Sequence, residues 1–178
     1  GGQLVKQTHQ FFGSKDQYAG TRGVDIAREL TEKVKQQAAI EVKTWAVVQG
    51  YYEDGVIGYL EDERFQKVKP EKTIIATGTA EKMLSFPNND LPGIYGAGAV
   101  QTLMNQYGIL PGQEILMIGA GNIGLIVSYQ LLQAGVKVKA VVEASNRIGG
   151  YAVHATKIRR AGIPILTKHT IKEARGDF

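Results

Sequence analysis

Hydrophobic residues in the second half of the chain alternate between two kinds of spacing. Some apolar positions recur at the spacing of a helix face, and others run together in short stretches typical of buried strands. The predicted elements are a helix over residues 97–107, a strand over 114–118, a helix over 122–133, a strand over 136–142, a helix over 150–160 and a strand over 163–166. Such alternation predicts an α/β fold, with a Rossmann-like parallel sheet and helices on both faces.

The first half of the chain has a different pattern. Residues 21–39 have helical apolar spacing, with an acidic residue early and lysines late, which suits the helix dipole. Two β-rich runs follow, over 41–52 and 55–60, and the Asp54-Gly55 step between them favours a tight hairpin. A third apolar run over 72–77 predicts a buried strand. A helix followed by a β-meander is therefore expected.

Residues 79–98 are rich in proline, asparagine and glycine and predict no regular element. We expect this stretch to connect two domains. The length of 178 residues suits one ordinary domain or two small ones.

Composition narrows the function classes. An apolar share of 43% is typical of a globular protein, and no apolar run approaches the length of a membrane span. The net charge of +4 is spread along the sequence, which gives nucleic-acid binding little support. There is no cysteine, so no disulfide, thiolate zinc site or redox dithiol can form within these residues. A cytoplasmic location is compatible with this composition.

Titratable residues form no obvious catalytic group. The three histidines, His9, His154 and His169, do not stand at metal-ligand spacing, so no metal site is predicted. His9 could act as an acid or base, but an ordinary polar loop histidine is the favoured interpretation. No catalytic side chain is assigned.

The strongest motif is the sequence Gly119-Ala120-Gly121-Asn122-Ile123-Gly124, which matches the pattern Gly-x-Gly-x-x-Gly. A predicted strand precedes it, a predicted helix follows it, and the acidic residue Glu143 ends the next strand, about 20 residues further on. This complete context predicts a dinucleotide-binding βαβ unit.

Each glycine has a physical role in such a unit. Gly119 allows a sharp turn, Gly121 lacks the Cβ that would block a pyrophosphate, and Gly124 allows close packing of helix and strand. We expect the backbone N–H groups of residues 120–124 to face the phosphates at the positive end of the helix dipole. The alternative is that the glycines serve only a tight strand-to-helix turn.

Glu143 is placed to accept hydrogen bonds from the adenosine ribose hydroxyls. Its charge would disfavour the extra phosphate of NADP by roughly 1 to 3 kcal/mol. NAD is therefore the expected dinucleotide, although Arg147 nearby weakens the preference because a guanidinium attracts phosphate.

Several motifs resemble those of thioredoxin reductase-like flavoproteins in the pyridine nucleotide-disulfide oxidoreductase superfamily. They are Gly1-Gly2-Gln3-Leu4, Ala76-Thr77-Gly78 and the segment over residues 91–96. Longer phrases over residues 2–14 and 96–104 are similar to the α subunits of sarcosine oxidase and dye-linked proline dehydrogenase, and to one of the subunits of hydrogen cyanide synthase. By this resemblance the chain is an internal segment, with a partial FAD-binding domain over residues 1–84 followed by most of an NAD-binding domain over residues 85–178.

The resemblance also implies cofactor residues. For FAD these are Gly1, Gly2, Gln3, Ala46, Val47, Thr77 and Gly78. A plain strand end is the alternative for Thr77 and Gly78, and a cloning remnant is the alternative for the first two glycines. FAD and NAD are the expected cofactors.

One departure from the resemblance is informative. Thioredoxin reductases carry a Cys-x-x-Cys pair shortly after the segment that corresponds to residues 92–96, and this chain has Ala97-Gly98-Ala99-Val100-Gln101-Thr102 there. Only a thiolate attacks a disulfide, so dithiol chemistry is excluded at this place. The expected activity is hydride transfer between NAD(H), or an amine or imino-acid substrate, and FAD, in an enzyme that has other subunits. The alternative is a structural or regulatory subunit whose βαβ site holds ATP or NAD without catalysis.

Overall fold

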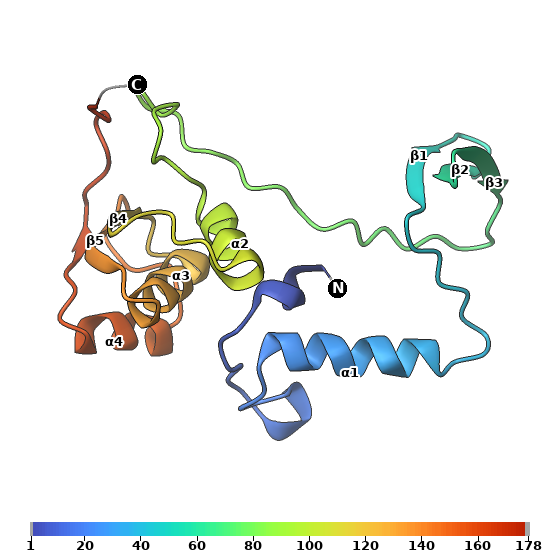
Figure 1. Ribbon diagram of the computed structural model, residues 1–178, viewed down its shortest axis with the longest axis horizontal. Coiled ribbons are helices and arrows are strands. Elements are labelled where there is room, and N and C mark those ends of the chain that lie inside the picture. The colour runs from blue at the N-terminus through green and yellow to red at the C-terminus, as the bar shows by residue number, and fades with distance from the viewer. Residues whose placement is uncertain (1, 177–178) are drawn as a thin grey trace. The chain divides into compact units, whose positions relative to one another are not determined.

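The computed structural model describes residues 2–176 (Figure 1). The chain forms two compact units. One combines the residues up to Ala27 with those from Ala80 onward, and the other comprises Arg28–Thr79. The helix α1, Gly23–Lys35, begins in the first unit and ends in the second.

The first unit is built on a parallel sheet. Its strands β4 (Glu114–Ile118), β5 (Lys137–Glu143) and β6 (Ile165–Thr167) lie side by side in chain order. Pairing is parallel throughout, with Met117 opposite Val141 and Val142 opposite Leu166. The predicted Rossmann-like sheet is confirmed.

Helices connect these strands. The helix α3, Asn122–Gln133, follows β4, and α4, Ala152–Arg160, follows β5 (Figure 1). Because both crossovers advance in the same direction along the sheet, right-handed connections place α3 and α4 on the same face. The core between the sheet and the helices α3 and α4 is formed by side chains that are almost fully buried, among them Leu125, Val127, Leu131, Val141 and Ile158.

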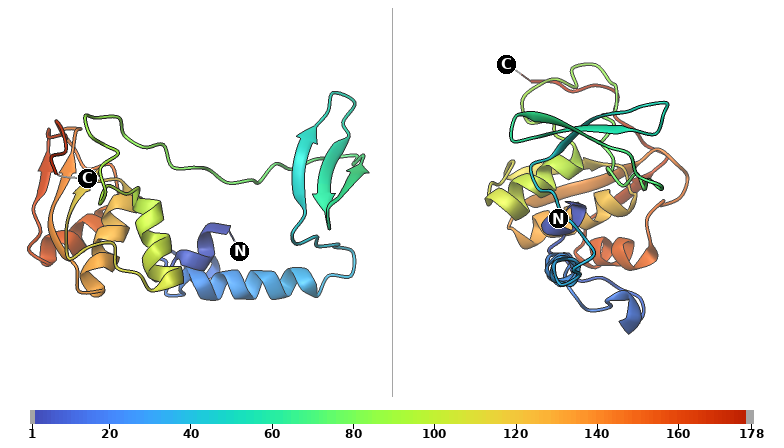
Figure 2. Two further views of the ribbon diagram at one scale, coloured as in Figure 1. Left: turned by 45° about the horizontal axis from the view of Figure 1, so that its top comes forward. Right: turned by 90° about the vertical axis from the view of Figure 1, so that its right-hand side faces the viewer.

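The helix α2, Ala97–Tyr107, packs on α3 and ends at Gly108 in the left-handed conformation. The N-terminal segment, which includes the short 3₁₀ helix Gly2–Lys6, packs on α2 (Figure 2). Buried amides hold it there: the side chains of Gln7 and Gln101 are hydrogen-bonded at 3.3 Å, and Gln101 donates to Gln130 at 3.0 Å. Residues 2–8 are thereby fixed on α2 and α3.

The second unit is an antiparallel meander of β1 (Val47–Tyr51), β2 (Ile57–Glu61) and β3 (Arg64–Val68). The predicted first hairpin is confirmed, with Gly55 at φ +80° and the Asp54 carboxylate accepting the N–H of Val56 at 3.2 Å. No strand was predicted where β3 lies.

The predicted buried strand over residues 72–77 is wrong. These residues form no strand, and the side chains of Ile74 and Ile75 are 91% and 75% exposed. A strand requires a neighbour to satisfy its backbone groups, and none of the described strands pairs with this run.

Candidate dinucleotide-binding site

The glycine loop joins β4 to α3 in one sharp turn. Gly119 has φ +101°, and its N–H donates to the carbonyl of Val142 at 2.7 Å, which ties the loop to β5. A Cβ on Gly124 would lie 2.1 Å from the carbonyl oxygen of Gly119. The first and third glycines are therefore required by the backbone itself.

Gly121 is different because nothing in the protein requires it to be glycine. Its φ of −74° and ψ of 176° suit any residue, and a Cβ built on it would meet no atom within 4 Å. Gly121 is exposed, and no side chain caps the start of α3. Open space at the positive end of a helix, beside uncapped N–H groups, is what an anionic group requires.

Glu143 lies at the end of β5 and contacts the glycine loop directly. One carboxylate oxygen accepts the N–H of Ala120 at 2.8 Å, and the other accepts the N–H of Ser145 at 2.9 Å. The carboxylate is therefore fixed at the carboxyl edge of the sheet. The N–H of Ala120 is already used, so the expectation that all N–H groups from 120 to 124 face a phosphate needs correction at this residue.

The segment before α4 completes the rim. Gly150 donates its N–H to the carbonyl of Ala120 at 2.9 Å, and Tyr151 donates its N–H to the side-chain oxygen of Asn122 at 2.8 Å. Ile123, on the first turn of α3, is 48% exposed. Residues 150 and 151 were not among the predicted site residues, although the paired glycines at 149 and 150 are a signal of close backbone approach.

The structure thus brings the expected NAD residues together around the start of α3. The residues expected to contact FAD are in different places: Gly1 lies outside the described residues, and Gly2 and Gln3 belong to the first unit. In the second unit, Ala46 is half-buried beside β1 and Val47 begins that strand, whereas Thr77 and Gly78 lie in exposed irregular chain.

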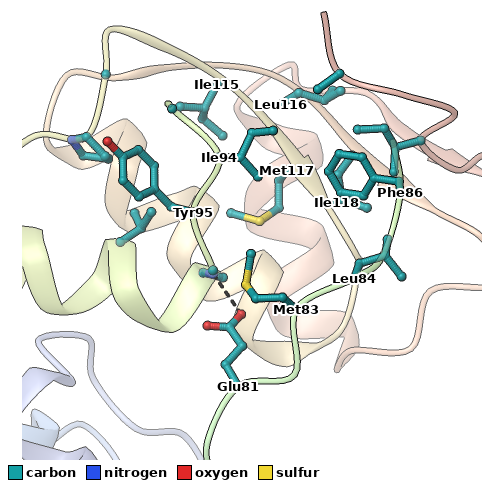
Figure 3. A pocket seen from close by; sticks show the side chains of 18 of the residues that line it. Glu81, Met83, Leu84, Phe86, Ile94, Tyr95, Ile115, Leu116, Met117 and Ile118 are labelled. Carbon is teal, nitrogen blue, oxygen red and sulfur yellow. Dashed lines mark hydrogen bonds between the residues drawn. The ribbon is translucent and has the colours of Figure 1, made fainter. Parts of the chain in front are cut away.

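A separate cavity of about 610 Å³ lies along β4. Its walls are mainly apolar and include Met83, Phe86, Ile94, Leu116 and Ile118 (Figure 3). In the part of the chain that the structure describes, β4 pairs only with β5, so the cavity lies at the outer edge of the sheet. It does not include residues 119–124 and is not the phosphate site.

At the mouth of that cavity the carboxylate of Glu81 caps α2 (Figure 3). It accepts the N–H of Ala97 at 2.9 Å and that of Gly98 at 3.0 Å. The positive end of α2 is therefore neutralised from within the chain. No helix in the described residues is long and apolar enough to cross a bilayer.

Comparison with known proteins agrees with this geometry. The α subunit of sarcosine oxidase from Rhizobium meliloti is 28% identical over 157 residues, which cover 80% of this chain and 16% of that subunit. The chain thus spans only about a sixth of this relative.

Solved structures show the same fold. Thioredoxin reductase from T. acidophilum aligns with a TM-score of 0.69 at 18% identity, over 99% of this chain and 56% of that one. L-proline dehydrogenase from P. horikoshii aligns with a TM-score of 0.62 at 16% identity, over 99% of this chain and 30% of that one.

The family comparison covers nearly the whole sequence, because residues 5–178 match the family described as pyridine nucleotide-disulphide oxidoreductase. The glycine loop, the fixed acidic residue and the parallel sheet are all features of such a nucleotide-binding unit. The chain belongs to the pyridine nucleotide-disulphide oxidoreductase family.

Proposed function

We propose that this chain supplies the NAD(H)-binding part of an FAD-dependent oxidoreductase. The observation that carries the proposal is the open space at Gly121, in front of the uncapped N–H groups that begin α3. A pyrophosphate there would accept hydrogen bonds from the first turn of the helix and be attracted by its dipole. No charged side chain is needed.

Glu143 supports NAD over NADP. Each of its carboxylate oxygens accepts one backbone N–H and keeps lone-pair capacity for a ribose hydroxyl. A phosphate in place of the 2′-hydroxyl would meet this fixed negative charge, at a cost of roughly 1 to 3 kcal/mol. We therefore assign Gly119, Gly121, Asn122, Ile123 and Glu143 to NAD, with Ala120 and Gly124 shaping the loop.

We propose that FAD is the second cofactor, held in part by the first residues, by Ala46 and Val47, and by Thr77 and Gly78. Gly2 and Gly78 both have positive φ, of +59° and +77°, and no Cβ at either would meet protein atoms within 4 Å. Both positions therefore allow a ligand to approach the backbone. The bound flavin would supply the hydride chemistry, and the protein would orient it.

Residues 1–84 then belong to an FAD-binding domain and residues 85–178 to an NAD-binding domain. On this assignment, the packing of residues 2–8 on α2 and α3 is a contact between domains. We propose that the enzyme is cytoplasmic, because NAD and NADH, which the reaction would require, are present inside the cell.

The substrate class is proposed from the relatives. One is named a sarcosine oxidase subunit and one solved structure is an L-proline dehydrogenase, so a secondary amine or imino acid is the proposed electron donor. The word subunit in the first name supports an enzyme with further chains.

Isothermal titration calorimetry of the chain with NADH, NADPH and ATP tests the nucleotide site. We expect binding of NADH below millimolar concentration and weaker binding of NADPH. Absence of binding for all three nucleotides would refute the site. Preference for ATP over NADH would refute the oxidoreductase role and favour a structural nucleotide.

A further inference from the structure

A cluster of aromatic rings joins the N-terminal segment to the start of α4. The ring of His9 stacks on Phe11, with centroids 5.3 Å apart, and meets the edge of His154 at 6.3 Å. The ring of Phe12 contacts both Tyr151 and His154, with centroids 5.4 Å apart in each case. Two histidines far apart in sequence therefore form the centre of one long-range contact.

The surroundings of the cluster disfavour an additional proton, most directly on His9. His154 is only 6% exposed, and Nδ1 of His9 is buried without a hydrogen-bond partner among the described residues. A protonated imidazole carries an N–H at both nitrogens. The charged form of His9 would therefore bury an N–H that has no acceptor.

The neighbouring charges act in the same direction. A small cavity beside His9 is lined by three other titratable side chains, His154, Lys157 and Tyr129, and none of its lining residues is a carboxylate. The ammonium of Lys157 lies 5.3 Å from the centre of the Tyr129 ring. A proton on either histidine would meet this positive charge without a described counter-ion in the cavity.

Both pKa values are lowered as a result. Burial lowers the pKa of His9, and the charges of His154 and Lys157 lower it further. Burial, followed by the charge of Lys157, lowers the pKa of His154.

We propose that the His9–His154 contact is a proton-sensitive latch, which holds residues 9–12 on α4 while both imidazoles are neutral and releases them when protons bind. The released state binds protons more tightly, so the latch is at full strength above the pKa of an exposed histidine, near 6.5. As the pH falls below that value, the latching equilibrium weakens by up to about tenfold per pH unit for each histidine.

The latch lies directly beside the glycine loop. Tyr151, which contacts Phe12 through its ring, donates its N–H to the side chain of Asn122 at the start of α3. Release of residues 9–12 would therefore loosen one wall of the nucleotide site. This consequence rests on the proposed function, whereas the latch itself does not.

Nuclear magnetic resonance of the whole chain tests the latch without any nucleotide. The three histidines of the sequence are few enough for separate ring signals, and the same chain unfolded in urea supplies the reference titration. We expect the ring signals of His9 and His154 to titrate at lower pH in the folded chain than in the unfolded chain. Nuclear Overhauser contacts between the rings of Phe12 and His154 should be present at pH 8 and lost at pH 5.

Two matched variants on α4 separate the latch from general acid destabilisation. Lys157→Gln removes the nearby charge and should raise the pKa of both cluster histidines, whereas Arg160→Gln removes an exposed charge and should leave them unchanged. The proposal is overturned if the cluster histidines titrate at the same pH in the folded and the unfolded chain, or if the Phe12–His154 contact persists after both are protonated. If the chain does not bind NADH but its Phe12–His154 contact depends on pH as expected, the nucleotide site is refuted and the latch is not.

Discussion

Adding one methyl group at Gly121 or at Gly124 should separate ligand binding from folding. Both positions belong to the Gly-x-Gly-x-x-Gly motif, but a Cβ at Gly124 would lie 2.1 Å from a backbone oxygen, whereas a Cβ at Gly121 would meet nothing within 4 Å. Gly121→Ala and Gly124→Ala are therefore matched substitutions with opposite expected effects.

Gly124→Ala should destabilise the fold. The new methyl overlaps the carbonyl of Gly119, which cannot move without disturbing the hydrogen bond from the Gly119 N–H to Val142. Overpacking of this kind costs up to about 3 kcal/mol, and the better helix propensity of alanine returns about 1 kcal/mol. A net loss of about 2 kcal/mol in unfolding free energy is expected.

Gly121→Ala should leave stability within about 0.5 kcal/mol of the original chain. The backbone angles at Gly121 suit alanine, and the lower entropy of the unfolded chain offsets the poorer N-cap. The methyl would, however, occupy the approach of the pyrophosphate. We expect NADH affinity to fall at least about tenfold, which corresponds to about 1.4 kcal/mol.

Urea unfolding followed by circular dichroism measures the first quantity, and calorimetric titration with NADH measures the second. Unchanged NADH affinity in a stable Gly121→Ala variant would refute the placement of the phosphate. Unchanged stability of Gly124→Ala would refute the close approach that the structure shows.

Three further substitutions test the roles of Glu143, Ser128 and Gln101. Glu143→Gln should reduce the preference for NADH over NADPH by about 1 to 2 kcal/mol in calorimetric titrations, since the fixed charge is lost; an unchanged ratio would contradict its role. Ser128→Ala should raise the unfolding free energy by about 0.5 to 1 kcal/mol, because the hydroxyl of Ser128 is buried without a described partner; a loss of stability in urea would reveal a hidden hydrogen bond. Gln101→Ala should lower the unfolding free energy by about 2 to 4 kcal/mol in the same assay, because it opens a cavity and leaves the side-chain amides of Gln7 and Gln130 without their hydrogen bonds to Gln101. A loss below about 1 kcal/mol would show that these hydrogen bonds do not fix the N-terminal segment.

Sequence patterns predicted the parallel-sheet unit well. The helix over residues 97–107, the strand over 114–118 and the helix over 122–133 agree with the structure residue for residue. The sequence signals for these elements are local, because apolar spacing sets the buried face of each element and glycines 119 and 121 mark the turn before α3. The flanking elements β5, α4 and β6 were displaced by one or two residues at their starts.

The meander was harder to predict because its second turn lacks the usual residues. Asp62 and Glu63 have φ of +48° and +62°, a conformation that hairpins normally give to glycine or asparagine. Glu61 is paired with Arg64 across this turn, and β3 follows directly. Because the turn residues are not those typical of a hairpin, the sequence did not indicate β3. The apolar run over 72–77 instead suggested a strand, which has no partner among the described strands.

Contacts between distant residues were beyond the sequence for a different reason. The Gln7–Gln101 and His9–His154 contacts join residues that are more than 90 positions apart, and one sequence contains no information on such pairs. The polar loop interpretation of His9 missed its aromatic surroundings for this reason. The nucleotide site was predictable because the glycine loop and Glu143 belong to one local βαβ unit.

The hydrogen bond from Ala120 to Glu143 limits how nucleotide preference can be changed. Ala120 is fully buried, so its N–H must keep an acceptor if Glu143 is replaced. Glu143→Ala would remove the negative charge but leave that N–H unsatisfied, and the loop that should hold the pyrophosphate would shift. Glu143→Gln keeps one side-chain oxygen for Ala120 and cannot also accept the N–H of Ser145. Glu143→Gln therefore reduces the preference for NADH, but a reversal in favour of NADPH requires an acceptor for Ala120 together with a new cation for the phosphate.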